Sequence, residues 1–536
     1  MKLSLSNINS EQFKSNSIKV PEFSIPEILE NTKANPTWIH FGAGNIFRGF
    51  IGRVAQELLN KGLSNTGIIA AETFDYEIIE RIYAPYDNLT LMADLNPSGD
   101  ISYEVIGSIV DTIKVGNMYE EDMNRLWKIS VAPSLQMLSF TITEKGYTLT
   151  NISGNLLPVV EEDIKNGPDC PKHTMSIITS MLLKRFNSGK LPLAVVSMDN
   201  CSHNGDKIKS SVLFIANEWL NRGFVTADFI DYINDETKIS FPWSMIDKIT
   251  PRPDSSIADK IASNLGIEDM EPITTSKGTF IAPFVNAEIP QYLVIEDKFP
   301  NGRPSFEKAG IYMTNRDTVD KSERMKVTTC LNPLHTSLAV FGCLLGYTKI
   351  SDEMANPMLV KLITDMGYNE GLKVVTDPVI LNPRDFINEV ITERLPNPFI
   401  PDAPQRIATD TSLKMPIRFG ETIKSYIASS ELDVTSLTLI PLTIAGWLRY
   451  LTGIDDNGNP FELSSDPLMP ELKSELSNVK FGEPSSVKGN INGLLMNKSI
   501  FGADLVECGL SSKIEDMLAS MLTGPGAVKE TIAKYV

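Results

Sequence analysis

One segment constrains the fold of this chain more than any other: a short apolar run that passes at once into a glycine-rich loop and then into an amphipathic helix. Thr37 to Phe41 (TWIHF) has strand-forming residues, and the loop GAGNIFRG follows directly. From Ile51 onward, apolar residues recur with the period of a helix that buries one face. The next apolar run, GIIAA, ends at Glu72. This succession predicts a strand, a glycine loop, a helix and a buried parallel strand that ends in an acid.

The glycine loop is suited to hold a pyrophosphate. Gly42 permits a tight turn, and Gly44 lets the backbone approach phosphates at the positive N-terminus of the following helix. The third glycine of the usual fingerprint is absent, because Phe47 stands there. A carboxylate at Glu72 would bind the hydroxyls of an adenosine ribose and repel a 2′-phosphate, which favours NAD over NADP. The alternative is an ordinary strand-to-helix turn with a solvated strand end.

The pattern of elements changes along the chain. Strand-like runs at 135–143 and 191–197 alternate with helical stretches such as 174–186, as in a doubly wound α/β domain. Beyond residue 285 the segments have helical patterning and are separated by proline-rich loops. We therefore expect an α/β domain over residues 1–285 and a mainly α-helical domain over residues 286–536.

The charge of the chain favours small-molecule partners. With 49 Lys and Arg against 67 Asp and Glu, the net charge is −18, and no basic run is present, so we expect neither nucleic acid nor a membrane as a partner. The N-terminus has no apolar stretch of the kind found in signal peptides, and the most apolar window, 434–451, is interpreted as a buried helical segment. We therefore expect a cytoplasmic protein. The sequence leaves its oligomeric state open.

The cysteines and histidines do not suggest a metal or disulfide framework. The five cysteines lack CxxC spacing and the four histidines are scattered, so we expect no structural metal site.

A second group of polar residues lies in MKVTTCLNPLHT. Pro333 suits the first turn of a helix and Asn332 its N-cap, so His335 would lie in the first turn, where the helix terminus disfavours a protonated imidazole. The Asn332 amide could then face a substrate oxygen. Lys326, if partly buried, would have its pKa lowered toward the range of a general base. The structural alternatives are a surface lysine, a simple cap and a core histidine.

A third group, SMDNCSHNG, directly follows an apolar strand, where α/β proteins place ligand-binding loops. Asn200 offers a second neutral hydrogen-bond donor there, although a simple turn of Asp, Asn and Gly is the alternative.

Taken together, these segments resemble the polyol-specific long-chain dehydrogenases, the mannitol dehydrogenase and fructuronate reductase family. Matching segments occur in one order across most of the chain, which makes the resemblance specific. It also accounts for Phe47, because family members carry Phe or His before Arg at that point. The matching segments are HFGAGNIFRG, IGSIVDTI, FTITEKGY, SMDNCSHNG, MIDKITPRP, VIEDKFPNGRPSFEKAG, MKVTTCLNPLH, RIATDTSLKMP and IFGADL.

The resemblance implies NAD(P)-dependent, metal-independent oxidoreduction of a sugar alcohol or a hexonate at a secondary alcohol carbon. It implies a Rossmann-type N-terminal domain and a mainly helical C-terminal domain. By motif position, Lys326 resembles the catalytic acid/base, and Asn200 and Asn332 resemble the pair that stabilises the reacting oxygen. His335 resembles the residue that positions the substrate, and Asp247 and Arg406 match substrate-contacting positions. The positions that resemble the cofactor-binding segment are Gly42, Gly44, Asn45, Ile46, Phe47, Arg48 and Glu72.

Three features depart from the family pattern. The spacing from Lys326 to Asn332 is one residue longer than usual and is followed by proline, Glu72 stands where aspartate is common, and the chain is longer than many relatives.

Within the family, the GAGNIFRG and CLNPLHT variants most resemble the fructuronate reductase branch, which implies interconversion of D-fructuronate and D-mannonate. A carboxylate substrate needs a cation, for which Arg406, Arg252 and Arg48 are candidates. Mannitol 2-dehydrogenase and tagaturonate reductase activities remain the alternatives. A non-catalytic NAD-binding sensor and a sugar isomerase are more distant ones.

Overall fold

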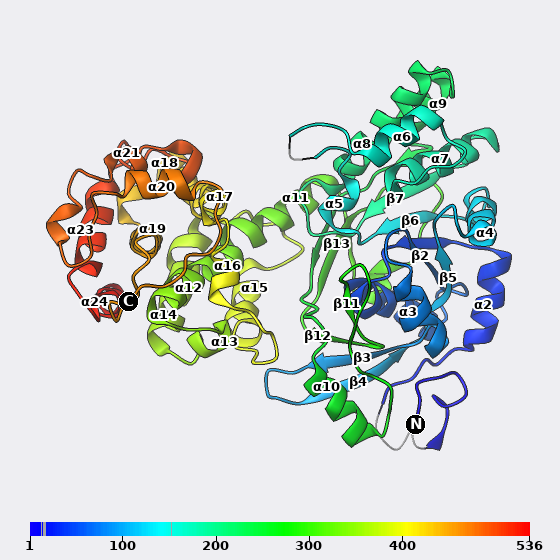
Figure 1. Cartoon of the computed structure of the whole chain (residues 1–536), viewed down its shortest axis with the longest axis horizontal. Helices are drawn as coiled ribbons and strands as arrows, with labels where there is room; N and C mark the ends of the chain where they lie inside the picture. Colours follow the sequence, from blue (N-terminus) through cyan, green and yellow to red (C-terminus); the bar gives the residue numbers. More distant parts are fainter. Residues whose placement is uncertain (12, 14–17, 152) are drawn as a thin grey trace. The chain divides into compact units, whose positions relative to one another are not determined.

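The computed structural model of the chain describes residues 1–11, 13, 18–151 and 153–536, and it contains two compact units (Figure 1). The first unit comprises residues 1–96 and 100–320, and the second comprises residues 97–99 and 321–536.

The division between the units follows the pairing of two late strands. β13 (Tyr292–Glu296) pairs with β9 (Ser244–Asp247) and with β14 (Tyr312–Thr314), so all three belong to the first unit. The sequence places the change near residue 285, because the composition becomes helix-like there, whereas the compact unit extends to Asp320. The difference arises because pairing with β9 retains these short strands in the first unit.

A six-stranded parallel sheet forms the centre of the first unit. Its strand order is β5-β2-β1-β6-β7-β8, so the order reverses between β1 and β6. This is the doubly wound arrangement of a Rossmann domain, in which ligands bind beyond the carboxyl ends of the strands at the reversal. It confirms the predicted fold class. The strands are β1 (Trp38–Phe41), β2 (Ile68–Glu72), β5 (Ile109–Lys114), β6 (Met137–Phe140), β7 (Leu193–Ser197) and β8 (Ile239–Ser240).

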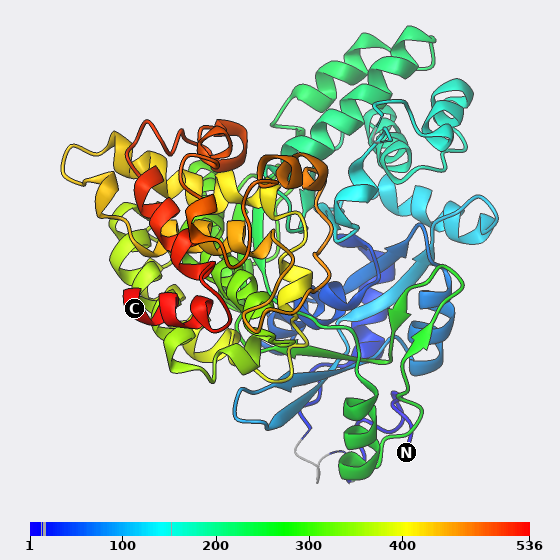
Figure 2. The same cartoon turned by 60° about the vertical axis from the view of Figure 1, so that its left-hand side comes forward.

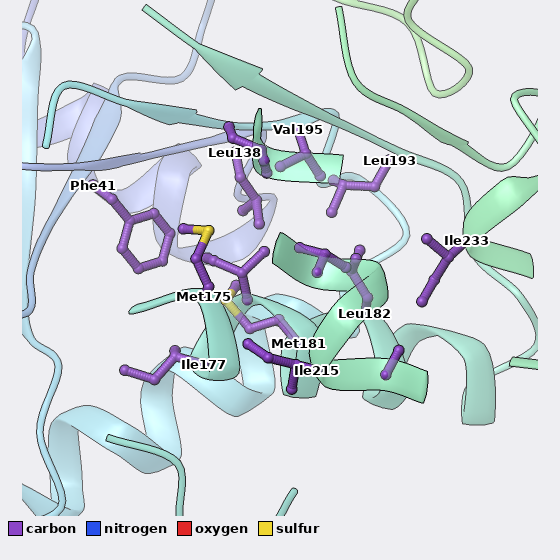
Figure 3. Close-up of a cluster of buried hydrophobic side chains, with 14 of the residues drawn as sticks. Phe41, Leu138, Met175, Ile177, Met181, Leu182, Leu193, Val195, Ile215 and Ile233 are labelled. Atoms are coloured by element: carbon purple, nitrogen blue, oxygen red, sulfur yellow. The ribbon is translucent and has the colours of Figure 1, made fainter. Parts of the chain in front are cut away.

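Apolar side chains cover both faces of this sheet, as expected for parallel strands. Ile39 and Phe41 of β1 belong to one buried cluster, while Trp38, on the opposite face of the strand, belongs to another. Figure 3 shows the first cluster, in which Phe41, Leu138 and Val195 point from the strands toward helix residues such as Met175 and Leu182.

Helices pack around the sheet of the first unit. Figure 2 shows the helices over residues 174–234 side by side, and α7 contacts α8. The principal helices are α2 (Ile25–Ala34), α3 (Gly52–Asn60), α4 (Glu120–Ser130), α5 (Thr143–Tyr147), α6 (Pro158–Asn166), α7 (Thr174–Asn187), α8 (Asn204–Asn221), α9 (Ala227–Asn234) and α10 (Ser255–Lys260).

Three small sheets complete the first unit. The strand orders are β12-β3-β4, β14-β13-β9 and β10-β11. Arg53 of α3 binds Asp94 of β3 and Glu104 of β4, which attaches the helix to one of these sheets. The additional strands are β3 (Thr90–Leu95), β4 (Ile101–Ile106), β10 (Ile273–Thr274), β11 (Phe280–Ile281) and β12 (Phe284–Glu288).

The second unit is helical. Residues 321–536, all of which are described, contain no strand longer than an isolated bridge. Every residue of α19 (Leu439–Tyr450) is buried, which agrees with most of the buried helical segment that the sequence predicts over 434–451. The first residues of that window form instead a short 3-10 turn, η11 (Val434–Ser436), with no buried residue. α19 contacts α12 and α23, and these helices lie together in Figure 1. α11 (Arg316–Met325) begins in the first unit and ends in the second. The longer elements of the second unit are α12 (Asn332–Leu345), α14 (Pro357–Asp365), α15 (Pro383–Glu389), α18 (Glu421–Ala428), α20 (Met469–Glu475), α23 (Ser511–Met521) and α24 (Ala527–Tyr535).

Among the described residues, one helical stretch is long and apolar enough to cross a membrane. It covers Arg316–Leu345, and 72% of its most apolar window is buried inside the protein. Such burial is typical of a core helix.

Candidate functional site

The glycine loop begins where β1 ends, and its first glycine is required by the geometry. Gly42 has φ of +100°, and a Cβ there would lie 2.3 Å from the carbonyl oxygen of Thr141. Its N–H donates to the Ala71 carbonyl over 3.0 Å, which joins the loop to β2. At Gly44, by contrast, a Cβ would have no atom of the described residues within 4 Å, so the space beside the loop is open for a phosphate.

Glu72, at the end of β2, holds the glycine loop in place. Its Oε2 accepts from the Ala43 N–H over 3.0 Å, and its Oε1 accepts from the N–H groups of Phe74 and Asp75. Burial raises the pKa of Glu72, and these three backbone donors oppose that rise. Each carboxylate oxygen has two lone pairs, so Oε2 retains capacity for a ribose hydroxyl.

The function of the missing third glycine is supplied further along the chain. Phe47 begins a π-helical turn, η1 (Phe47–Ile51), and stacks on His40 at 4.0 Å between ring centroids. A Cβ on Gly49 would lie 2.8 Å from Val285, and one on Gly52 would lie 3.2 Å from Ile106. These two glycines therefore permit the close packing that the third fingerprint glycine normally provides.

Arg48 is buried and hydrogen-bonded within the first unit. The side chain is fully buried, its Nη1 donates to the Ala282 carbonyl over 2.8 Å, and its Nη2 donates to Asn45 Oδ1 over 2.7 Å. Burial lowers its pKa to about 10. Arg48 thus fixes Asn45 in the glycine loop, while Ile46, the next residue, is half-buried.

The loop after β7 carries Asn200, which is exposed. Its neighbour Asp199 accepts from the N–H groups of Ile142 and Thr143, so the loop is tied to the one that follows β6. Asn204 is buried, and its side chain forms hydrogen bonds with the backbone N–H and carbonyl of Ser244, both at 3.0 Å.

Asn204 therefore joins two predicted site segments. Ser244 begins β9, which ends at the buried Asp247, so the hydrogen bonds connect the loop of Asn200 to the strand of Asp247. Sequence reasoning included the motif that contains Asn204 but did not single this residue out. An asparagine at the start of a helix that follows a ligand-binding loop was the available signal.

Lys326 lies in a π-helical turn of the second unit. It is 2% exposed and begins η6 (Lys326–Cys330), which the Leu331 N–H closes by donating to the Lys326 carbonyl over 3.1 Å. A π turn spans one residue more than an α turn, and such turns are frequent at functional sites. The turn therefore accommodates the long spacing between Lys326 and Asn332.

The N-cap of α12 is Leu331, one residue before the predicted Asn332. Leu331 is the N-cap of α12 and Asn332 is its first residue, with no side-chain capping hydrogen bond from the described residues. The reason is the π turn, which commits the Leu331 N–H to Lys326 and places Leu331 at the helix boundary. The Asn332 amide is therefore not used as a cap.

His335, in the first turn of α12, is held beside an acid that the sequence did not reveal. Its Nε2 lies 2.7 Å from Asp402 Oδ2, and Asp402 Oδ1 also pairs with Arg406 of α16 (Pro404–Ile407). Burial acts to raise the pKa of Asp402, but His335 and Arg406 outweigh it and lower this pKa. The structure thus brings His335 and Arg406 together through Asp402.

Two further cations lie near the start of α12. Arg418 Nη1 donates to Thr336 Oγ1, and Thr336 Oγ1 donates to the Asn332 carbonyl over 2.9 Å. Lys414 precedes Arg418 by one helical turn. Sequence reasoning missed both residues, although Lys414 lies within the matching segment RIATDTSLKMP.

The described part of the chain contains no group of three or more His, Cys, Asp or Glu side chains that could hold a metal ion.

Comparison with known proteins assigns the family. Residues 36–308 match the mannitol dehydrogenase Rossmann domain, and residues 318–522 match the mannitol dehydrogenase C-terminal domain. The chain is 53% identical to the D-mannonate oxidoreductase of Thermotoga maritima, over 97% of this chain and 96% of that protein.

Two solved structures are similar over nearly their whole length. One is D-sorbitol dehydrogenase in substrate-free form, with a TM-score of 0.79, 25% identity, and coverage of 97% of this chain and 100% of that one. The other is the ternary complex of Pseudomonas fluorescens mannitol 2-dehydrogenase with NAD and D-mannitol, with a TM-score of 0.70, 25% identity, and coverage of 100% and 99%. On the family domains and the close relative together, this chain belongs to the mannitol dehydrogenase family.

Proposed function

We propose that the protein is an NAD-dependent oxidoreductase that interconverts D-fructuronate and D-mannonate. The observation that carries this proposal is the 53% identity, over 97% of the chain, to a relative named D-mannonate oxidoreductase. The substrate is a small sugar acid, and the enzyme acts in the cytoplasm.

The first unit has the features that NAD requires. Gly42 makes the turn, the open space at Gly44 receives the pyrophosphate, and Glu72 Oε2 has a lone pair for the adenosine ribose. A related structure contains NAD. When bound, NAD exchanges a hydride with the carbinol carbon of the substrate. The carboxylate of Glu72 disfavours a 2′-phosphate and hence NADP.

The second unit supplies the acid/base group. In the oxidation direction Lys326 takes the hydroxyl proton, and in reduction it returns that proton to the carbonyl oxygen. Its burial at 2% exposure supports this role, because a buried side chain is shielded from bulk water and held near one position.

Neutral donors stabilise the charge that develops on the substrate oxygen. We assign this role to the amides of Asn200 and Asn332, each worth about 3 kcal/mol in the transition state by comparison with known oxyanion donors. The lack of a capping bond at Asn332 among the described residues supports the assignment, since its amide is available for a substrate oxygen. His335, oriented by Asp402, positions the substrate, and Asp247 and Arg406 contact it.

The alternatives within the family are mannitol 2-dehydrogenase and tagaturonate reductase activities. The relatives favour a sugar acid over a polyol, because the chain is 53% identical to a D-mannonate oxidoreductase and only 27–28% identical to two mannitol 2-dehydrogenases. A non-catalytic NAD-binding sensor would have no need for a buried lysine beside the start of α12.

The proposal is tested by following NADH absorbance with D-fructuronate, D-tagaturonate and D-fructose offered side by side, and again with NADPH. We expect turnover with D-fructuronate and NADH to exceed all other combinations. Faster turnover of D-fructose would indicate a mannitol 2-dehydrogenase, and faster turnover of D-tagaturonate would indicate a tagaturonate reductase. Tight NADH binding without turnover of any keto sugar would support the sensor.

A further inference from the structure

Trp243, the residue before β9, contacts the loop that carries Asn200. The ring of His203 stacks on the Trp243 ring, with 4.1 Å between the centroids and 22° between the planes. His203 follows Asn200 in the same loop after β7. Trp243 Nε1 also donates to Asp206 Oδ1 over 3.0 Å, in the first turn of α8, which follows this loop. One indole therefore contacts the end of the Asn200 loop and the start of the next helix.

The same indole contacts the first residue of α11. The guanidinium carbon of Arg316 lies 5.0 Å from the centroid of the Trp243 ring, within the range of a cation–π contact. Arg316 Nε donates to Oε2 of Glu296 over 2.9 Å, and this oxygen also accepts from the Trp243 backbone N–H over 3.1 Å. Glu296 is buried, so its charge requires such partners. Arg316 and Trp243 thus share one buried acid.

His203 binds α11 one turn further along. Its Nε2 lies 3.1 Å from Oδ1 of Asp320, which follows Arg316 by one helical turn. The side chain of His203 is 51% exposed, so its position is set by these contacts rather than by a packed core. His203, Trp243, Arg316 and Asp320 all belong to the first unit. We call these four residues the α11 anchor.

α11 begins a long helical stretch that carries the proposed catalytic residues of the second unit. The stretch runs from Arg316 to Leu345 and comprises α11, η6 and α12. α11 has 10 residues, and Lys326 follows it directly. Asn332 and His335 lie further along the same stretch. Because a helix of this length is stiff, an anchor at its first turn constrains the backbone that leads to Lys326.

We propose that His203 and Trp243 are positioning residues for the reaction: they hold the loop of Asn200 against the start of the helix that carries Lys326. The inference rests on the proposed function, in which the Asn200 amide and the Lys326 ammonium act on one substrate oxygen. Such groups accelerate a reaction only in the productive geometry, and a displacement of about 1 Å can cost about 100-fold in rate. The α11 anchor constrains the loop and the helix together.

The alternative is a cluster that only stabilises the first unit. Both accounts predict a lower Tm when the indole is removed, so Tm does not distinguish them. They differ in the rate of the reaction and in its dependence on Asn200. A positioning role lowers the rate through Asn200, whereas a stabilising role leaves the rate of the folded enzyme unchanged.

The test measures NADH oxidation in a single turnover with saturating D-fructuronate, so that product release does not enter the rate. In Trp243→Leu we expect this rate to fall about tenfold, while the dissociation constant of NADH stays within about twofold of wild type. Trp243→Phe, which retains an aromatic ring for His203, should recover most of the loss. His203→Ala, at an exposed position, should lower the rate about threefold.

A double-mutant cycle separates positioning from structure. In an Asn200→Ala background, adding Trp243→Leu should lower the rate less than about twofold, because the amide that the α11 anchor positions is gone. If Trp243→Leu does not fold, His203→Ala takes its place in the cycle. A reduction by the same factor in both backgrounds would overturn the inference, and so would wild-type rates in Trp243→Leu and His203→Ala.

Trp127→Leu is the matched control. Trp127 is, like Trp243, half-buried in the first unit and in contact with a cation, since Lys184 Nζ lies 4.8 Å from its ring centroid. This variant should keep the wild-type rate. An Asn200→Ala enzyme with the wild-type rate would show that the loop has no donor to position, and would overturn the inference. Wild-type enzyme that does not turn over D-fructuronate at all would instead overturn the proposed function.

Discussion

His335 Nε2 lies 2.7 Å from Asp402 Oδ2, and the other oxygen of that carboxylate pairs with Arg406. One acid therefore lies against two side chains that come from different helices of the second unit. The contact holds His335 beside a negative charge, although its Nε2 has no partner in hydrogen-bond geometry among the described residues.

The Asp402 contact predicts a loss of function when its charge is removed. In Asp402→Asn, we expect kcat/KM for D-fructuronate to fall by about ten- to 100-fold, because His335 and Arg406 lose their shared carboxylate, as for other partners that orient catalytic side chains. Asp365→Asn, which removes a half-buried acid paired with Lys361, is the matched control. Unchanged kinetics in Asp402→Asn would show that the orientation of His335 does not depend on this acid.

Asp402 also predicts a dependence of stability on acid pH. Folding lowers the pKa of Asp402. Asp402 therefore stabilises the protein at pH values above its pKa in the unfolded chain, and this stabilisation is lost as the pH falls through its pKa in the folded protein. The difference in Tm between wild type and Asp402→Asn should therefore be largest near pH 6 and shrink as the pH falls below about 4. A difference that is constant over this range contradicts the lowered pKa.

Two glycines of the nucleotide loop should respond differently to alanine. Gly42→Ala introduces a Cβ 2.3 Å from the Thr141 carbonyl at a positive φ, so we expect destabilisation of at least about 1–3 kcal/mol. Gly44→Ala meets no atom of the described residues within 4 Å, and should retain the wild-type Tm while weakening NADH binding through contact with the pyrophosphate. Thermal unfolding and NADH fluorescence titration distinguish the two effects. If Gly44→Ala bound NADH as tightly as wild type, the pyrophosphate would not lie beside Gly44.

Glu72 should control the choice of cofactor. In Glu72→Ser, the repulsion of a 2′-phosphate disappears together with the ribose contact, so KM for NADH should rise by about tenfold and the preference for NADH over NADPH should shrink. Tm should fall as well, because three backbone N–H groups lose their acceptor. Glu57→Ser, on the exposed face of α3, serves as the control. An unchanged ratio of NADH to NADPH activity would exclude a role in discrimination.

Glu353, which no step of the reaction uses, predicts a second dependence of stability on pH. Burial, reinforced by Asp402 and Asp352, raises its pKa to about 9, and neither carboxylate oxygen has a hydrogen-bond partner among the described residues. When folding raises the pKa of an acid, the protein loses stability as the pH rises from the pKa of that acid in the unfolded chain toward its pKa in the folded protein. Glu353→Gln should therefore gain Tm over wild type as the pH increases from 5 to 8. A gain that is the same at both values would contradict a protonated Glu353.

The sequence was sufficient to predict the elements that depend on local patterns. The alternation of apolar runs and amphipathic helices predicted the parallel sheet, and the glycines marked the loop after β1. The buried helix α19 followed from its apolar composition. Each of these features depends on neighbours along the chain, which is why a single sequence reveals them.

The sequence could not predict contacts between distant segments. Asp402 lies far along the chain from His335, and nothing local marks it as a partner. Arg48 was identified as part of the cofactor loop, yet only the fold shows that its guanidinium is buried against Ala282. The N-cap at Leu331 depends on a π turn, which the helix propensities of the residues do not predict. The roles of the predicted site residues themselves remain proposals for kinetic tests.

The catalytic lysine can be tested apart from cofactor binding. In Lys326→Ala we expect NADH affinity close to that of wild type and a loss of about 100- to 10,000-fold in kcat, the usual contribution of general acid–base catalysis. A kcat within a few fold of the wild-type value would show that Lys326 does not transfer the proton.

The reduction of D-fructuronate is tested by the stoichiometry and product of one reaction. Wild-type enzyme is incubated with D-fructuronate and NADH, absorbance reports the NADH consumed, and NMR identifies the sugar acid formed. We expect one D-mannonate for each NADH oxidised, with the reverse reaction observed from D-mannonate and NAD. Absence of NADH consumption, or formation of a product other than D-mannonate, would contradict it.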